Sequence, residues 1–276
     1  MQIVKDALGA LASVLFPAPC RICGQPLTNA RRIPLCETCL AGFVRIIEPM
    51  CPQCGRPSDL QPGIEAGARP CRLCRLGFYA FDRARSFAVY DDALLEAVVL
   101  LKYEEVTRLG NWFADRLEEV LRESSEKWRK IDAVVPVPLH PDRRRERGYN
   151  QAELIARPLA VRIGAKLMAN ALQRIKPRPP QLILSRSERW KSVRGAYVAR
   201  PNARVSGLRV LLIDDVFTTG ATLDSCAREL KRAGAASVFG LTVGRVRLSA
   251  VNAAGLGSRL ARASQKTGRA NAPSIG

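Results

Sequence analysis

The sequence predicts an α/β protein in which a parallel sheet flanked by helices follows a small N-terminal module that binds zinc. Eight of the nine cysteines form four Cys-x-x-Cys pairs before residue 75. From about residue 81, strand-like and helix-like segments alternate at a spacing typical of parallel strands joined by covering helices. The strongest predicted strand, 208–214 (LRVLLID), leads through a Thr-rich loop into the strongest predicted helix, 221–233.

Residues 1–16 are predicted to form a short packing helix, because Leu8, Leu11 and Leu15 recur at roughly helical spacing. The apolar run has the length of a signal segment, but Asp6 interrupts it and no small-residue cleavage site follows. No run reaches the roughly 18 apolar residues of a membrane helix. We therefore expect no membrane span.

Residues 17–80 are rich in Cys, Pro, Gly and Arg, so we expect metal rather than a conventional core to hold them together. Twelve residues separate Cys23 from Cys36, and 16 separate Cys54 from Cys71. Both gaps suit a double zinc ribbon, in which two knuckles bind one tetrahedral ion and each ion contributes on the order of 10–16 kcal/mol. Sequential pairing of the knuckles is expected. The predicted ligands of two structural Zn²⁺ ions are Cys20, Cys23, Cys36, Cys39, Cys51, Cys54, Cys71 and Cys74.

Both metal sites have all four positions filled by Cys, which predicts stabilisation or partner docking rather than catalysis. Paired thiols also indicate a reducing compartment, so we expect a cytoplasmic protein. The ninth cysteine, Cys226, is expected to be a small buried residue of a helix. The arginines that flank the knuckles either contact phosphates or form solvated surface, the second being slightly favoured; they are Arg21, Arg31, Arg32, Arg56, Arg72 and Arg75.

The sheet domain is predicted to occupy 81–246. Strands are expected at 84–90, 131–137, 171–175, 208–214 and 237–243, and helices at 93–103, 109–122, 149–163, 187–193 and 221–233. Pro158 is expected to kink its helix or to end it early. From 247 to 276 the chain is rich in Ala, Gly, Ser and Arg and has no acidic residue, which predicts a disordered basic tail.

The segment from Val210 to Leu223 carries most of the functional prediction. Ligands of open α/β sheets bind at the carboxyl edge, where Asp214 and Asp215 are expected to accept hydrogen bonds from ribose hydroxyls and to place Mg²⁺ through water. The following loop offers backbone N–H groups, hydroxyls and a helix N-terminus, all donors suited to a phosphate monoester. That loop consists of Thr218, Thr219, Gly220, Ala221 and Thr222. The alternative is that these residues are only a polar strand end and a helix N-cap. The occurrence of both aspartates and the Thr-rich loop directly after an apolar strand disfavours this alternative.

This segment resembles the ribose-phosphate signature of the type I phosphoribosyltransferases, and nearly the whole chain resembles the ComF family. The motifs that carry the resemblance are the paired Cys-x-x-Cys module, Leu101-Lys102-Tyr103, Val135-Pro136-Val137-Pro138-Leu139, Arg147-Gly148-Tyr149-Asn150-Gln151, Gln181 with Leu184, Glu188–Tyr197 and Asp214–Thr222.

The resemblance implies a type I phosphoribosyltransferase-like sheet and a site for phosphoribosyl pyrophosphate (PRPP). Asp214 and Asp215 would hold the ribose and 218–222 the 5′-phosphate, and Lys102 would point to the same site. The loop after Val137 would lie near the pyrophosphate, with Arg143, Arg144, Arg145 and Arg147. A mobile hood would come from roughly 175–194. Pro179-Pro180 stands where a Thr is usual, and Ser192 where an Asn is common, so these departures bear on turnover more than on binding.

The chain carries 44 Lys and Arg against 25 Asp and Glu, a formal net charge of +19 and a pI near 10.2. This excess favours polyanions such as nucleic acid, but an Arg- and Ala-rich composition is equally typical of GC-rich genomes. Residues 130–200 hold 16 basic against five acidic side chains. Trp190 and Tyr149 are the candidates for base stacking in this region.

Three functions are compatible with the sequence. The first is a Mg²⁺-dependent phosphoribosyltransferase, a glycosyltransferase of unknown acceptor, in which placement and charge stabilisation supply the catalysis without a protein nucleophile. The only histidine, His140, fits this as a loop residue. The second is a DNA-uptake accessory protein, since ComF relatives are associated with natural transformation, where single-stranded DNA meets a helicase-like competence protein. The third is a regulator that binds the ligand without turnover.

Overall fold

The computed structural model describes residues 18–27, 33–57, 69–124, 128, 130–177 and 186–247. The predicted N-terminal helix, Arg31, Arg32, Gln181, Leu184 and the basic tail beyond Arg247 lie outside the described residues. In the described part of the chain, no helix combines the length and the apolar character needed to cross a membrane.

A five-stranded parallel sheet forms the centre of the molecule, with the strand order β1-β7-β6-β2-β3. The strands are β1 (Arg83–Val89), β2 (Ala133–Pro136), β3 (Lys166–Leu167), β6 (Arg209–Phe217) and β7 (Ser237–Arg245). Their apolar residues are buried on both faces of the sheet, as expected where helices cover both sides. The predicted α/β class with a parallel sheet is confirmed.

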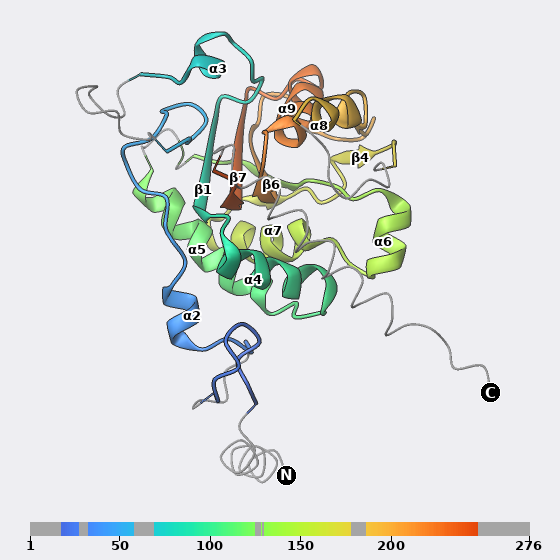
Figure 1. The fold of residues 1–276 in the computed structure, drawn as a ribbon. Helices are drawn as coiled ribbons and strands as arrows, with labels where there is room; N and C mark the ends of the chain where they lie inside the picture. Colours follow the sequence, from blue (N-terminus) through green and yellow to red (C-terminus); the bar gives the residue numbers. More distant parts are fainter. Residues whose placement is uncertain are drawn as a thin grey trace, which may run out of the picture.

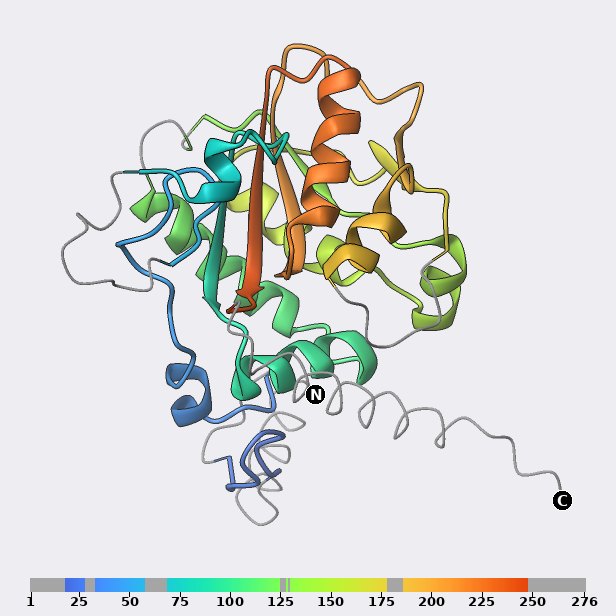
Figure 2. The same cartoon turned by 45° about the horizontal axis from the view of Figure 1, so that its top comes forward.

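Helices cover the two faces of the sheet unequally (Figures 1 and 2). One face carries α4 (Asp92–Tyr103), α5 (Leu109–Glu123) and α7 (Gln151–Arg162). The other carries α9 (Ala221–Arg232) and α8 (Arg186–Val193), beside the antiparallel hairpin of β4 (Leu172–Arg174) and β5 (Tyr197–Ala199). The strand expected at 171–175 therefore forms within this separate hairpin and not in the main sheet.

Strand β6 is longer than predicted, so the two aspartates do not lie at its end as expected. It was expected to end at Asp214, but pairing with β7 continues from Asp214 opposite Thr242 to Phe217 opposite Arg245. Asp214 and Asp215 therefore lie inside the strand. Because successive side chains of a strand leave opposite faces of the sheet, the two carboxylates point in different directions.

Pro158 lies inside α7 and does not end it. A proline has no N–H group, so the carbonyl of Leu154, four residues earlier, lacks its helical donor. Gly110 of α5 packs against this carbonyl, and a Cβ at that position would lie 2.8 Å from the Leu154 oxygen. The early end considered for this helix is thus wrong. A short helix that was not predicted, α6 (Pro141–Arg147), precedes α7.

The cysteine-rich module contains two short helices, α2 (Glu37–Ala41) and α3 (Arg72–Arg75), one in each ribbon. In both views α3 lies near one end of β1, whereas α2 lies beyond the other end (Figures 1 and 2). The second ribbon bonds directly to the sheet, because the Ala84 N–H donates to the Gln53 carbonyl at 2.7 Å. The two ribbons therefore occupy separate places on the molecule.

Candidate functional site

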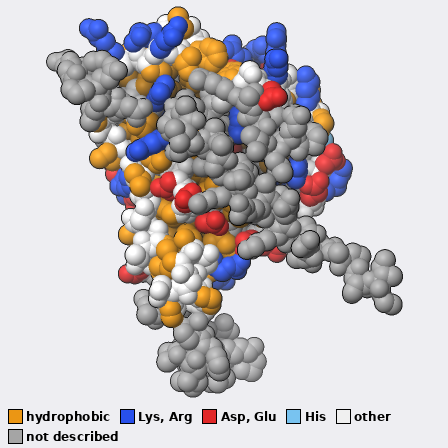
Figure 3. All heavy atoms as spheres, viewed as in Figure 1, with side chains coloured by type: hydrophobic (Ala, Val, Ile, Leu, Met, Phe, Trp, Pro, Cys, Tyr) orange, Lys and Arg blue, Asp and Glu red, His pale blue; other side chains and the backbone are white. Residues whose placement is uncertain are grey.

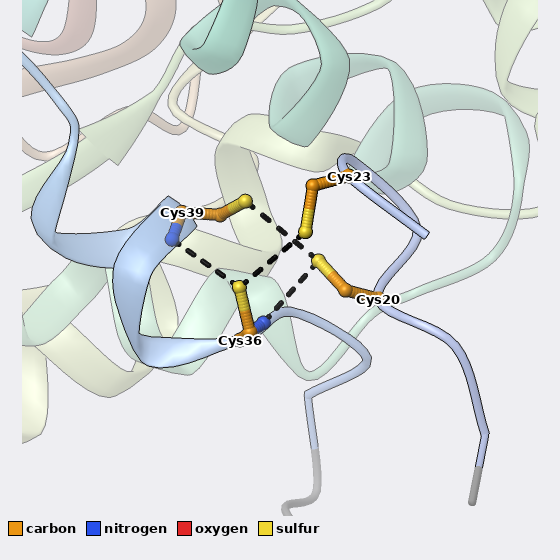
Figure 4. A group of neighbouring side chains, drawn as sticks. All are labelled: Cys20, Cys23, Cys36 and Cys39. Atoms are coloured by element: carbon orange, nitrogen blue, oxygen red, sulfur yellow. Dashed lines mark hydrogen bonds between the residues drawn. The ribbon is translucent and has the colours of Figure 1, made fainter. Parts of the chain in front are cut away.

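Four sulfur atoms of the first ribbon converge on one point (Figure 4). The Sγ atoms of Cys20 and Cys39 are 3.8 Å apart, and those of Cys23 and Cys36 are 3.6 Å apart. A tetrahedral ion with Zn–S bonds of about 2.3 Å requires sulfur–sulfur distances of about 3.8 Å. The Cys36 backbone N–H also donates to the Cys20 sulfur, as is usual around thiolate ligands. The residues fit a structural Zn²⁺ ion.

The second ribbon repeats this arrangement with Cys51, Cys54, Cys71 and Cys74. The Sγ atoms of Cys51 and Cys74 are 3.7 Å apart and those of Cys54 and Cys71 are 3.8 Å apart. The expected sequential pairing of knuckles agrees with both groups. Of the first four ligands Cys23 is exposed, whereas three of the second four are buried. The eight predicted ligands thus form two zinc-ribbon sites, and the second is the more deeply packed.

Asp215 lies in a buried network on the α4 and α7 side of the sheet. Its Oδ2 is 3.0 Å from the Lys102 ammonium and accepts a 2.8 Å hydrogen bond from Gln151 Nε2. Burial raises the pKa of Asp215, but Lys102 and Gln151 stabilise the carboxylate and hold the pKa below its usual value. Burial alone would lower the pKa of Lys102, but the facing carboxylate of Asp215 more than offsets this and the pKa is raised. Both Lys102 and Asp215 are therefore ionised at neutral pH.

Asp214 faces the other side of the sheet, where Arg174, Tyr197 and Cys226 are its electrostatic neighbours. Its Oδ1 accepts a 2.9 Å hydrogen bond from the backbone N–H of Asp215. Burial, with a smaller contribution from Asp215, raises the pKa of Asp214 to about 7. Among the described residues, no cation forms an ion pair with this half-buried carboxylate as Lys102 does with Asp215. Its oxygen atoms suit a hydroxyl group or hydrated Mg²⁺.

The predicted phosphate loop connects β6 to α9. The backbone N–H groups of Thr218, Thr219 and Gly220 face no protein acceptor within the described part of the chain. Gly220 has φ +81°, a left-handed conformation that glycine adopts without strain. Free N–H donors at the start of a helix form a site for a phosphate group. The Thr219 hydroxyl is engaged within the loop, because its Oγ1 accepts a hydrogen bond from the Ala221 N–H.

The structure separates the four arginines that were predicted to serve pyrophosphate. Arg143, Arg144 and Arg145 lie on the exposed surface of α6, where each pairs with an acidic side chain. Arg147 instead donates a 2.7 Å hydrogen bond to Gln151 Oε1, and its guanidinium lies 4.8 Å from the centre of the Tyr103 ring. Arg147 alone among them joins the network of Asp215. His140 caps the N-terminus of α6 with its Nδ1.

Helix α8, part of the segment predicted as a hood, contacts the phosphate loop from outside. Arg189 Nη1 lies 3.4 Å from Thr218 Oγ1. The Trp190 ring packs at 4.7 Å from Phe78, which follows the second ribbon. Ser192, where an Asn is common, hydrogen-bonds the Arg189 carbonyl within its own helix. Helix α8, the C-terminal part of the predicted hood, thus lies against the loop.

Several residues of this site were not assigned a role from sequence. Gln151 lies in one of the family motifs. Its role could not be read from one segment, because Asp215 of β6 contacts Gln151 of α7 and Lys102 of α4. Tyr79 donates its hydroxyl to the Thr219 carbonyl at 3.0 Å, although 140 positions separate the two residues. Arg245, the last residue of β7, reaches the second ribbon. No motif marks either of the last two.

Positive side chains lie in separate groups on the face of the molecule drawn in Figure 3, interrupted by hydrophobic and acidic side chains. Several of the basic residues of 130–200 are in ion pairs, among them Arg157 with Glu153 and Arg162 with Asp115. Because of these ion pairs, the basic residues of 130–200 offer a ligand less positive charge than their number suggests.

Comparison with known proteins gives the family. The model for the double zinc ribbon domain matches residues 11–75. The DNA utilization protein YhgH of Salmonella typhimurium is 31% identical over 224 residues, which cover 80% of this chain and 94% of that protein. The competence protein ComFC of Bacillus subtilis is 29% identical over 76% of this chain and 83% of its own length.

Two solved structures are more distant. Adenine phosphoribosyltransferase from Thermoanaerobacter pseudethanolicus is 17% identical, covers 53% of this chain and 83% of its own, and has a TM-score of 0.33. Purine phosphoribosyltransferase from Pyrococcus horikoshii is 20% identical, covers 49% and 87%, and has a TM-score of 0.30. Superpositions at these scores carry no inference about the site. The relatives and the double zinc ribbon show that the chain belongs to the ComF family.

Proposed function

We propose that the chain binds PRPP or a related ribose phosphate together with Mg²⁺, in the reducing environment of the cytoplasm, where its metal-ligating thiols stay reduced. One observation carries the proposal: at the carboxyl edge of a parallel sheet, the half-buried carboxylate of Asp214 is followed by a loop, 218–220, whose backbone N–H donors face no acceptor among the residues that the structure describes. Ligands of open α/β sheets bind at this edge.

In this proposal each group has one task. The loop N–H groups and the N-terminus of α9 bind the 5′-phosphate, and Asp214 accepts hydrogen bonds from the ribose. Mg²⁺, when bound, would neutralise the pyrophosphate, and Asp214 would hold it through water. Lys102 neutralises Asp215 and keeps Gln151 and Arg147 ordered beside the site. Transfer of the phosphoribosyl group then needs an acceptor but no protein nucleophile.

Calorimetry on the zinc-loaded full chain tests binding. Titration of PRPP in the presence of Mg²⁺ is expected to give saturable heat, and Asp214→Asn is expected to weaken it. An absence of heat from a folded, zinc-loaded sample would count against the proposal. Release of pyrophosphate from PRPP, measured across a panel of nucleobases and nucleotides, separates a transferase from a protein that only binds the ligand.

A second candidate is a role in handling single-stranded DNA during uptake, together with a helicase-like competence protein. Its support is the basic excess of residues 130–200 and the printed names of the relatives, a competence protein and DNA utilization proteins. Binding that rests on phosphate contacts weakens steeply as salt rises. Fluorescence anisotropy of a labelled oligonucleotide from about 50 to 200 mM salt would refute this candidate if affinity stayed constant.

The two candidates are compatible, because a sugar-phosphate site also suits a nucleotide end. Asp214→Asn, which changes the carboxylate proposed to bind the ribose, discriminates between them. If the variant loses transformation in cells but keeps DNA binding, ligand sensing or catalysis is the function that matters. If both persist, the ribose-phosphate site is not needed for uptake.

A further inference from the structure

We propose that the second zinc ribbon, and not the first, sets the conformation of the phosphate loop, and that Arg245 and Tyr79 are the positioning residues that connect them. This goes beyond ligand binding, because it concerns the loop in the free protein. The two zinc sites have the same four-cysteine ligand chemistry. Their surroundings are different.

Arg245 links a zinc ligand to the strand that carries the loop. Its side chain is 5% exposed. Nη1 donates a 2.8 Å hydrogen bond to the Cys54 carbonyl, and Nη2 lies 3.7 Å from the Cys54 sulfur. On its other side the guanidinium lies 3.9 Å from the centre of the Phe217 ring. Phe217 is the last residue of β6 and precedes the loop directly.

The charge of the metal centre explains why a buried arginine is stable there. Four thiolates around one Zn²⁺ carry a formal charge of about −2. A buried guanidinium is costly unless an opposite charge and hydrogen bonds compensate it. Two mostly buried arginines meet this ribbon: Arg245 at Cys54, and Arg85, which donates to the Pro52 carbonyl at 3.2 Å. Without the metal the compensating charge falls, so the position of Arg245 over Phe217 depends on zinc.

Tyr79 makes the second connection. It lies five residues after Cys74, and its hydroxyl donates to the Thr219 carbonyl inside the loop. A Cβ at Gly220 would lie 2.8 Å from the Tyr79 ring, so ring and loop backbone are in close contact. The next residue, Ala80, donates its N–H at 2.6 Å to Asp224 in the first turn of α9. The end of the second ribbon therefore holds the loop and the start of α9.

The first ribbon has different neighbours. Phe43 packs edge to face on Trp112 of α5, at 5.6 Å between ring centres. Arg45 pairs with Glu123 at the end of α5 at 2.8 Å. Cys20 and Leu35 belong to the core on the α4 and α5 side, whereas Cys51, Cys54 and Cys74 belong to the core that contains Phe217 and Ala221. The buried residues of the first ribbon therefore pack in a different core from the one that contains Phe217 and Ala221.

Hydrogen exchange of peptides spanning 217–222, read by mass spectrometry on the full chain, tests the proposal. We expect Cys54→Ser and Arg245→Lys to speed exchange in the loop by about tenfold or more, and Cys23→Ser to leave it within about twofold. Arg85→Lys is the matched control, because it changes a buried arginine on the same ribbon that does not contact Phe217. Zinc content is measured on each sample.

Unchanged loop exchange in a Cys54→Ser protein that has lost one zinc would overturn the proposal, and so would an equal effect of Cys23→Ser. Should Cys54→Ser prevent folding, Tyr79→Phe tests the connection to the loop, because it removes the hydroxyl that donates to the Thr219 carbonyl and changes no zinc ligand. Loop exchange unaffected by both Tyr79→Phe and Arg245→Lys would also overturn it. These readings need no ligand, so a failure of PRPP binding leaves them intact.

Reciprocity gives a second readout. If zinc at the second ribbon raises the affinity of the loop for a phosphate ligand, that ligand must raise the affinity for this zinc by the same factor. Inorganic phosphate or ribose 5-phosphate is expected to raise the concentration of a chromogenic chelator that removes one of the two zinc ions at equilibrium, and Tyr79→Phe to reduce this effect. Equal protection of both ions would contradict the assignment to one ribbon.

Discussion

The ammonium group of Lys102 lies 3.0 Å from the Oδ2 of Asp215, in an environment where both side chains are largely buried. The pair joins the end of α4 to the middle of β6, beneath the candidate ligand site. Two charges so placed compensate each other, and each depends on the other for its stability.

Lys102→Met is therefore expected to destabilise the protein by about 2–4 kcal/mol, because it leaves a buried carboxylate unpaired. The double variant Lys102→Met with Asp215→Asn is expected to recover most of this loss. Urea denaturation of the two single variants and the double variant measures the coupling as a double-mutant cycle. Additive effects would show that the two side chains do not depend on each other.

Asp214 predicts a dependence of stability on pH. Its pKa in the folded protein is about 7, and an unfolded aspartate has a pKa of about 3.9. Between these values the folded state keeps a proton that the unfolded state has lost. The free energy of unfolding therefore falls as pH rises from about 4 to about 7, and this contribution is constant above that window.

Asp214→Asn is expected to remove this slope and to be more stable than the parent chain at pH 8, by roughly 2–4 kcal/mol. Urea denaturation at several pH values in zinc-containing, magnesium-free buffer checks it. Comparing the two proteins at each pH removes the pH dependence that they share, including proton competition for the zinc thiolates. A parallel pH dependence in both proteins would mean that Asp214 titrates normally.

Local sequence predicted the parts of the site that lie within one segment. The spacing of the cysteines predicted the two groups of four that the structure brings together, and the order of strand, Thr-rich loop and helix at 210–223 predicted the loop that connects β6 to α9. The directions of Asp214 and Asp215 were not predictable in this way. They depend on how far β6 extends, and pairing with β7 as far as Phe217 and Arg245 decides that.

The connections between modules were also beyond local sequence. Cys54 and Arg245 are 191 positions apart, and Tyr79 and Thr219 are 140 apart. Neither a period nor a motif relates such residues, because their contact arises from the packing of the second ribbon on the sheet. Local sequence also did not show which arginines at 143–147 are exposed: the helix that contains them, capped by His140, leaves Arg143, Arg144 and Arg145 exposed and Arg147 partly buried.

Arg147 and Arg145 provide a direct test of which arginine serves the site. Arg147→Ala removes the hydrogen bond to Gln151 and the contact with Tyr103, so we expect it to weaken PRPP binding by about tenfold, the loss of roughly one charge-assisted hydrogen bond. Arg145→Ala removes an exposed ion pair with Asp142 and is expected to change affinity less than about twofold. Calorimetry with Mg²⁺ compares them. Equal losses would mean that the exposed face of α6 contacts the pyrophosphate.

Gly220 is the position where the loop tolerates least change. A Cβ there would lie 2.6 Å from Phe217 Cζ and 2.8 Å from Tyr79 Cε1, and the residue has φ +81°. Gly207 has a similar φ of +74°, but a Cβ at that position meets nothing within 4 Å. Gly207→Ala thus reports the cost of the left-handed backbone alone, about 1 kcal/mol. Gly220→Ala adds a steric clash with two aromatic rings.

We expect Gly220→Ala to destabilise the chain by about 1–3 kcal/mol more than Gly207→Ala does, in the range measured for overpacked positions. It is also expected to abolish ribose 5-phosphate binding, because the rings can yield only if the loop N–H groups move. Urea denaturation and calorimetry on both variants test these expectations. Equal destabilisation would show that Phe217 and Tyr79 yield freely, and retained binding would show that the phosphate is held elsewhere than at 218–220.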